Sequence, residues 1–288
     1  MGEKLIRFDW AVKRVLRSKA NFGILEGFLS ELLRVDIKIL EVLESEGNKE
    51  TQDDKFNRVD LLVKNSRGEL IIIEVQVTSE YDLLSRMLYG AAKAIWEYIK
   101  EGDSYKEVKK VYSVNILYFD LGKGDDYVYR GKTIFLGLHT NTELELSEKQ
   151  KLLYQKEQVS QIFPEYYVIK VNQFNDYAKD ALDEWIYFLK NEEIKGEFHA
   201  RGLKEASEKL RVMKMSEEEQ RRYRGYLEDL HYQASMIESS YGVGKLEGIK
   251  EGKLEGMKEA ALKMKKSNMS LEVIQGVTGL SKEEIENL

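Results

Sequence analysis

The chain is 288 residues long, carries a formal net charge of −6, and contains no cysteine and one proline. Its hydrophobic fraction of 42% is enough for a packed core, but no run of about 18 apolar residues is present and the charged N-terminus has no apolar signal core, so we expect neither a membrane span nor a secretion signal. Without cysteine the chain has no disulfides or thiolate metal sites, which fits a cytoplasmic protein. Its acidic balance argues against nonspecific coating of nucleic acid, because counterion release requires clustered Lys and Arg.

The N-terminal part is predicted to contain two helices and a strand. Apolar residues recur at helical spacing over residues 8–16 and again over residues 25–33, which indicates two amphipathic helices. Apolar and polar residues alternate over residues 35–42, as they do in a strand. A polar loop follows and brings Asp53, Asp54 and Lys55 towards the next element. Basic residues also cluster on the first helix, where a solvated surface is the more common explanation. They are Lys13, Arg14, Arg17 and Lys19.

A β-hairpin is predicted around the polar stretch from Asn65 to Gly68. Two runs rich in Val, Ile and Leu flank this stretch, Val59–Val63 and Leu70–Val77. A three-residue loop with Gly68 in the left-handed conformation pairs Asn65 with Glu69. Continued along the ladder, this register places Asp60 directly opposite Glu74.

Two acidic side chains are therefore expected to meet across the hairpin. Residues two apart on a strand share a face, so Glu74 and Gln76 point the same way. Directly opposed residues have Cβ atoms about 4.5–5.5 Å apart, and two carboxylates that close are unfavourable unless a cation lies between them. Hard oxygen ligands favour Mg²⁺ or Mn²⁺. The alternative is an ordinary hairpin with one carboxylate on a solvated face.

The segments after the hairpin are predicted to complete a mixed sheet flanked by helices. A helix is expected over Glu80–Lys100, with a buried stripe that includes Leu84 and Leu88. Its other face aligns Arg86, Tyr89 and Lys93 at helical spacing, and we expect these three residues to bind phosphate groups. The strand Val111–Phe119 then follows by a parallel, right-handed crossover. Further elements are the strands Thr133–His139 and Tyr166–Val171 and the helix Asp176–Leu189.

From about residue 191 the composition changes to charged and helix-favouring. Ser216 and Ser281, each followed three residues later by Glu, are capping-box signals. Glycine recurs every fourth position from Gly244 to Gly256, which indicates either a helix that self-associates or a flexible linker. We therefore divide the chain into a domain at 1–190 and a helical tail at 191–288, which ends in two short helices suited to packing or partner binding.

Asp60, the hairpin and Glu74-Val75-Gln76 together resemble the PD-(D/E)xK nuclease core, with Gln76 where that motif usually has lysine. With Arg86 and Tyr89, they resemble the recombination-promoting nuclease (Rpn) family, also described as PD-(D/E)xK nuclease family transposases. The resemblance implies a restriction-endonuclease-like α/β fold in which Asp60, Glu74 and the Val75 carbonyl bind the metal. It further implies that Gln76 replaces the catalytic lysine and that Arg86 and Tyr89 face the DNA. Lys55 and a glutamate of the preceding helix, Glu26 or Glu31, would be accessory residues of the same site.

The sequence thus predicts a metal-dependent DNA endonuclease that serves recombination or transposon-like mobility. Glutamine carries no charge and cannot carry a proton, so a DNA-binding module that has lost cleavage is the first alternative. An assembly protein that acts through the glycine repeat is the second. A carboxylate-pair glycosidase ranks last, because nothing indicates a sugar cleft.

Overall fold

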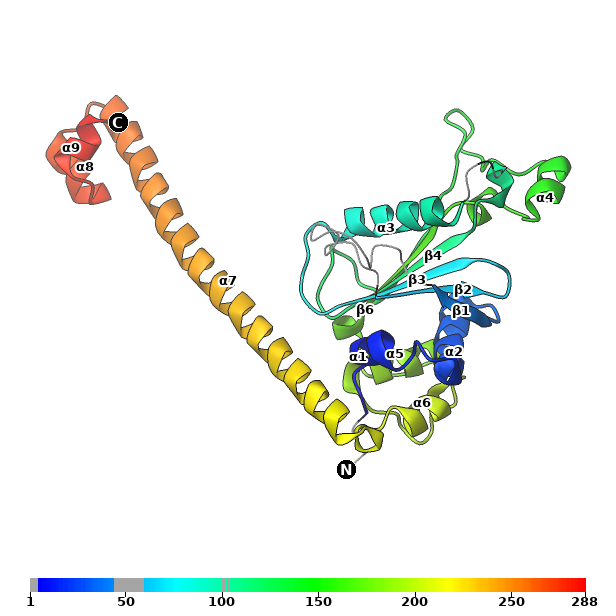
Figure 1. Ribbon diagram of the computed structural model, residues 1–288. Coiled ribbons are helices and arrows are strands. Elements are labelled where there is room, and N and C mark those ends of the chain that lie inside the picture. Colours follow the sequence, from blue (N-terminus) through cyan, green and yellow to red (C-terminus); the bar gives the residue numbers. More distant parts are fainter. Residues whose placement is uncertain (1–4, 44–59, 100–101, 103) are drawn as a thin grey trace. The chain divides into compact units, whose positions relative to one another are not determined.

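The computed structural model describes residues 5–43, 60–99, 102 and 104–288, and its first compact unit, which ends at Gln220, contains a six-stranded mixed sheet. The strand order is β1-β2-β3-β4-β6-β5, with helices on both faces (Figure 1). The strands are β1 (Ile39–Leu43), β2 (Leu61–Asn65), β3 (Leu70–Gln76), β4 (Val111–Leu117), β5 (Val128–Gly131) and β6 (Glu165–Lys170). This arrangement confirms the predicted fold class.

The predicted hairpin and its register are confirmed. Strands β2 and β3 are antiparallel, with Leu61 paired to Ile73. At the turn, the Asn65 N–H donates to the Glu69 carbonyl at 3.0 Å. Gly68 has a φ of 74°, the left-handed conformation that glycine adopts without strain.

Strands β3 and β4 are parallel and are joined through helix α3 (Leu83–Tyr98), as predicted. Ala91 and Ala94 of α3 pack on Leu62 and Ile72, which lie on the same face of the sheet as Glu74. The predicted burial of Leu84 and Leu88 is wrong, since each is 62% exposed. Small alanines let the helix approach the sheet closely, and this orientation leaves the larger leucines outside.

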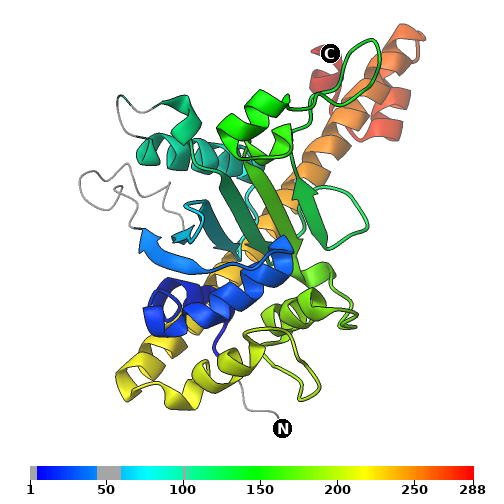
Figure 2. The same cartoon turned by 90° about the vertical axis from the view of Figure 1, so that its right-hand side faces the viewer.

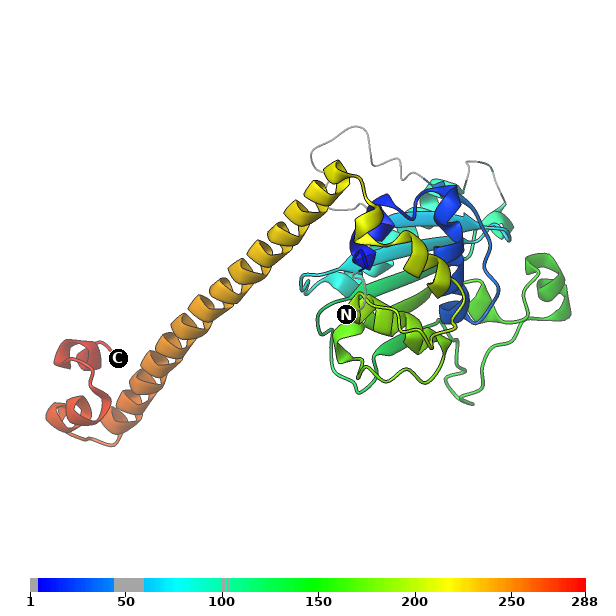
Figure 3. The ribbon, with the colours of Figure 1, turned by 90° about the horizontal axis from the view of Figure 1, so that it is seen from below.

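The opposite face of the sheet is covered by α1 (Phe8–Arg14), α2 (Phe22–Leu33) and α5 (Ala181–Asn191), and α6 (Leu203–Lys209) packs on α2 (Figures 1 and 3). The core shared by α1, α2 and α5 is aromatic: the ring centroid of Phe8 lies 5.6 Å from that of Phe28 and 6.4 Å from that of Trp185. Such edge-to-face contacts fix the helices to one another. Figure 2 shows the sheet from the side, between this layer and α3.

One predicted strand does not form. Residues 133–139 contribute only an isolated bridge from Leu136 to Glu143, and the sixth strand is instead β5, which pairs antiparallel with β6. The apolar residues of TIFLGLH are largely exposed, Leu138 to 97%. An apolar run by itself did not distinguish a strand from this exposed loop. Nearby lie the short helix α4 (Glu148–Tyr154) and several single 3₁₀ turns.

Residues 191–220 pack on the first unit, so the predicted division at residue 190 does not coincide with its boundary. The Leu5 N–H donates to the Glu192 carbonyl at 3.2 Å, and the Ile6 N–H donates to the Leu210 carbonyl at 2.7 Å. In addition, a Cβ atom added to Gly27 would lie 2.1 Å from the Arg201 carbonyl oxygen, so only glycine permits this close packing.

The second unit comprises Arg221–Leu288 and is helical, as predicted. Helix α7 (Glu217–Lys266) includes the whole glycine repeat, which excludes the linker alternative. It is followed by α8 (Leu271–Thr278) and α9 (Lys282–Glu286), which pack on Ala261 through a small apolar core. Both predicted capping boxes form, at Ser216 and Ser281. None of the helices in the described part of the chain is long and apolar enough to cross a membrane.

Candidate metal and nucleic-acid site

Asp60 lies directly before β2 and is held by strand β3 and by two basic residues of the N-terminal segment. Its Oδ2 accepts a hydrogen bond from the Val75 N–H at 2.8 Å, so the carboxylate reaches the residue after Glu74 on β3. Its Oδ1 lies 3.2 Å from Lys13 Nζ, and the Arg17 Nη2 donates to its backbone carbonyl at 2.7 Å. Lys13 of α1 and Arg17, which follows this helix, therefore fix Asp60 at the end of the hairpin.

Glu74 lies on the α3 face of β3 and is only 9% exposed. Gln76 Nε2 donates to Glu74 Oε2 at 3.2 Å, and Arg86 Nη2 lies 3.7 Å from the same oxygen. Burial raises the pKa of Glu74 to about 7, and the negative charge of Asp60 contributes to this increase, whereas Arg86 and the Gln76 hydrogen bond oppose it. The hydrogen bond from the Val75 N–H holds the Asp60 carboxylate next to the residue that follows Glu74, so the two acids lie close enough to interact.

The Val75 carbonyl lies on the strand edge that faces Asp60. The N–H and carbonyl of one strand residue point to the same side, and the Val75 N–H is already bonded to Asp60. The Asp60 and Glu74 carboxylates and this carbonyl are oxygen donors, which suit a small divalent cation that keeps several waters. Within residues 5–43, 60–99, 102 and 104–288, however, no group of three His, Cys, Asp or Glu side chains is arranged to hold a metal. Two carboxylates are a sufficient set for Mg²⁺.

Helix α3 brings Arg86 to the acids, but the other two predicted phosphate-binding residues lie farther out. Arg86 Nη1 donates to both carboxylate oxygens of Glu80, at 3.0 and 2.8 Å, while its Nη2 faces Glu74. Tyr89 is 53% exposed. Lys93, about 10 Å along the helix from Arg86, pairs with Glu97 at 3.7 Å. The three residues thus form a line from the acids along α3.

The accessory residues are not brought to Glu74 by the structure. Glu26 Oε1 accepts from the Ile39 N–H at 2.9 Å and its Oε2 accepts from Lys38 at 3.1 Å. Ile39 pairs with Asn65 at the turn end of the hairpin, whereas Glu74 lies near the other end. Glu31 lies further along α2 and is partly buried, and Lys55, with Asp53 and Asp54, lies outside the described residues.

Three residues at the site were not predicted. Lys13 and Arg17 were visible only as members of a basic cluster, with nothing to connect them to Asp60. Asn115 pairs with Glu74 across β3 and β4, and its amide donates to Ser113 at 3.0 Å and to the Tyr167 carbonyl at 3.2 Å. Its position as a polar residue within the otherwise apolar strand VYSVNILYF is the sequence signal that could have indicated Asn115.

Comparison with known families identifies the fold. The family described as PD-(D/E)XK nuclease family transposase matches residues 6–240. No curated protein and no solved structure matches the chain. The family match spans the hairpin acids, α3 and the whole sheet, so it supports the predicted resemblance and a nuclease-like or transposase-like role. By this match the chain belongs to the PD-(D/E)XK nuclease family transposases, and its mixed sheet with flanking helices is a restriction-endonuclease-like fold.

Proposed function

We propose that this protein is a metal-dependent DNA endonuclease in which Asp60, Glu74 and the Val75 carbonyl hold Mg²⁺ or Mn²⁺. The observation that carries the proposal is geometric: the Val75 N–H donates to Asp60 Oδ2 at 2.8 Å, which holds the Asp60 carboxylate beside the buried Glu74 on the neighbouring strand. Burial raises the pKa of Glu74 to about 7, and repulsion by the charge of Asp60 adds to this increase. Asp60 and Glu74 would hold such a cation as carboxylates, so Glu74 would give up its proton on binding and the repulsion between the two acids would be offset. When bound, such an ion activates water and neutralises a phosphate oxygen.

The protein's own residues contribute positioning and charge. The Gln76 amide holds Glu74 by a hydrogen bond and can donate to a phosphate oxygen, but it does not transfer a proton. Arg86 supplies a planar guanidinium beside Glu74, suited to a phosphate. Lys13 and Arg17 place two more cations next to Asp60, so the site has the positive flanks that an anionic strand requires despite the net charge of −6.

Plasmid cleavage tests the proposal. Supercoiled plasmid is incubated with the protein in Mg²⁺, Mn²⁺ or EDTA, beside Asp60→Ala, Glu74→Ala and the surface control Glu41→Ala. We expect nicking that requires the metal and both acids and that the control retains. Nicking that persists in EDTA or in both acid variants contradicts it. A single-stranded RNA substrate in parallel tests the choice of DNA.

A catalytically inactive DNA-binding module is the second candidate, and one contact favours it. Lys13 Nζ lies 3.2 Å from Asp60 Oδ1, where it competes with a cation for that oxygen. In this case the wild type and both acid variants shift DNA equally in a gel, and none cleaves it.

The role in recombination or transposition and the self-association of α7 are further parts of the proposal. The glycines of α7 from Gly244 to Gly256 have open space at their Cβ positions, so the repeat leaves room for close approach of a second helix. Apolar side chains such as Leu246 and Ile249 are 62% and 58% exposed along the same helix. Light scattering of the full chain and of a chain ending at residue 239 tests this part.

A further inference from the structure

A polar cavity lies at the end of the sheet opposite to the acids. Its volume is about 420 Å³, within the usual range of small-molecule sites, about 300–1,000 Å³. It is lined by Glu69, which precedes β3, by Lys110, which precedes β4, and by Glu165 at the start of β6. Glu69 directly precedes β3 and Glu74 lies five residues further along the extended chain, a separation of about 16 Å. The cavity is therefore separate from the proposed nuclease site.

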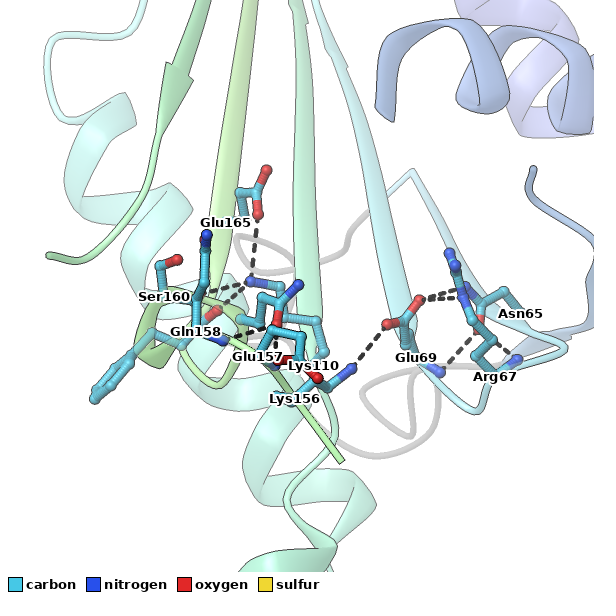
Figure 4. Close-up of polar contacts among 11 residues, drawn as sticks. Asn65, Arg67, Glu69, Lys110, Lys156, Glu157, Gln158, Ser160 and Glu165 are labelled. Carbon is cyan, nitrogen blue, oxygen red and sulfur yellow. Dashed lines mark hydrogen bonds and ion pairs between the residues drawn. The ribbon is translucent and has the colours of Figure 1, made fainter. Parts of the chain in front are cut away.

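Two buried carboxylates organise the cations of this cavity. Glu69, 6% exposed, accepts from Arg67 Nε at 3.0 Å and from Lys156 Nζ at 3.3 Å through its two oxygens (Figure 4). Asn65 Nδ2 adds a third hydrogen bond to Glu69, at 2.8 Å. The Glu69 carboxylate thus has hydrogen-bond partners on both oxygens, and it holds the two cations Arg67 and Lys156 in place.

Glu165 does the same on the other side of the cavity. Its Oε1 accepts from Arg130 Nε at 2.6 Å, and its Oε2 lies 3.4 Å from the buried Lys110 Nζ. The Tyr167 hydroxyl also donates to Oε1, at 2.5 Å. The hydrogen bonds from Arg130 and Tyr167 and the charge of Lys110 hold the pKa of Glu165 below its ordinary value against the effect of burial, so it remains charged.

The charges around the cavity do not cancel. Five cations line it, Arg67, Lys110, Arg130, Lys132 and Lys156, against three carboxylates, Glu69, Glu157 and Glu165. The excess is two positive charges, and the two buried carboxylates are already surrounded by donors. A metal ion is therefore a poor occupant, and an anion is a suitable one.

Unused donors point to the kind of anion. In the described part of the chain, Arg67 and Arg130 make their hydrogen bonds through Nε, which leaves the Nη nitrogens of each guanidinium available. Two arginine forks match the oxygens of a phosphate group in number and geometry. Tyr112 also lines the cavity, and burial raises the pKa of its hydroxyl to about 12, so it remains a donor at neutral pH.

We infer that this cavity binds a small phosphorylated ligand, whose phosphate groups lie between the guanidinium groups of Arg67 and Arg130. Lys132, which is exposed at the cavity, adds a further positive charge. The site is independent of the nuclease proposal, because none of its residues touches Asp60 or Glu74 in the contacts of the described residues.

Calorimetric titration at low ionic strength tests the inference, with inorganic phosphate, pyrophosphate and ADP as separate probes. We expect pyrophosphate or ADP to bind the wild type, and Arg67→Ala/Arg130→Ala to weaken this binding by about tenfold or more. The matched control, Lys64→Ala/Lys263→Ala, removes two charges from exposed ion pairs elsewhere and should bind as the wild type does. If ADP binds more tightly than pyrophosphate, the ligand of the cavity is a nucleotide. If the two affinities are equal, the cavity recognises the phosphate chain alone.

A second pair of variants keeps the test valid if the arginine variant unfolds. Lys132→Ala and Tyr112→Phe leave Glu69 and Glu165 with all their partners, and each should weaken binding severalfold. Glu74→Gln, at the other end of β3, should leave the affinity of the cavity for these probes unchanged. The inference is overturned if none of the three probes binds at millimolar concentration, if the cavity variants bind as tightly as the control, or if only duplex DNA binding depends on these residues.

Discussion

Replacement of Glu74 by glutamine should stabilise the protein at neutral and alkaline pH and not at acidic pH. The carboxyl pKa rises from 4.5 to about 7 on folding, mainly through burial and the charge of Asp60. Between these two values the folded chain holds a proton that the unfolded chain has released. The free energy of unfolding therefore decreases as the pH rises through this window. A shift of this size corresponds to about 3 kcal/mol at pH 8.

Glu74→Gln removes this loss because the amide is neutral at every pH. Urea unfolding at pH 5 and pH 8 measures the difference between the variant and the wild type, which cancels the titration of all other groups. We expect a small difference at pH 5 and a gain of up to about 3 kcal/mol at pH 8, equivalent to roughly 6–12 °C in the unfolding temperature. Arg86 retains both hydrogen bonds to Glu80 in the variant, so it is not left unpaired.

Two results would refute this reasoning. One is a difference in unfolding free energy that does not change between pH 5 and pH 8. The other is a variant less stable than the wild type at pH 8. Glu41→Gln serves as the control, because Glu41 is half-exposed and paired with Lys64 at 3.2 Å, and it should change stability by well under about 1 kcal/mol at either pH. Addition of Mn²⁺ at pH 8 should stabilise the wild type and not Glu74→Gln.

Three further predictions concern the neighbours of the acids and the tail. Lys13→Ala removes the ammonium that competes for Asp60, so Mn²⁺ affinity measured by calorimetry should rise roughly two- to fivefold, whereas Lys19→Ala should not change it. Arg86→Ala removes the charge that lowers the pKa of Glu74, so the pH at which Mn²⁺ binds should move upwards, and an unchanged midpoint would contradict this role. Gly248→Ala and Gly252→Ala should each stabilise an isolated α7 by about 1 kcal/mol, as measured by its circular dichroism melt. If these variants instead abolish a dimer in light scattering, the glycines form a helix–helix contact.

The hairpin was predictable in detail because its constraints are local. The loop from Asn65 to Gly68 determines the pairing, and the alternation of side chains then determines the face of Glu74 and Gln76. The parallel crossover to β4 followed from the length of the connection. Each of these inferences uses residues close in sequence or a rule of chain geometry.

The features that the sequence did not reveal depend on tertiary packing. The orientation of α3 is set by Ala91 and Ala94 against the sheet, and apolar spacing alone fits the orientation that buries Leu84 equally well. The contact between Lys13 and Asp60 joins residues 47 positions apart through the aromatic packing of α1, for which no short-range pattern exists. Glu26 contacts Ile39 at the turn end of the hairpin, and the sequence did not reveal this position, since a helical pattern gives a face but no position along the strands.

In the proposed site Gln76 takes the position that is usually lysine, and the environment of Asp60 and Glu74 gives a physical account of how a glutamine suits it. A lysine at residue 76 would place an ammonium beside Glu74, where Arg86 Nη2 already lies 3.7 Å from Oε2. Lys13 supplies a second cation at Asp60, from a different element. Each acid thus has one cation from a flanking helix, α3 for Glu74 and α1 for Asp60. Gln76 can then contribute a neutral donor without leaving either carboxylate uncompensated, so Gln76→Lys should lower the pKa of Glu74 and shift the pH midpoint of Mn²⁺ binding downwards.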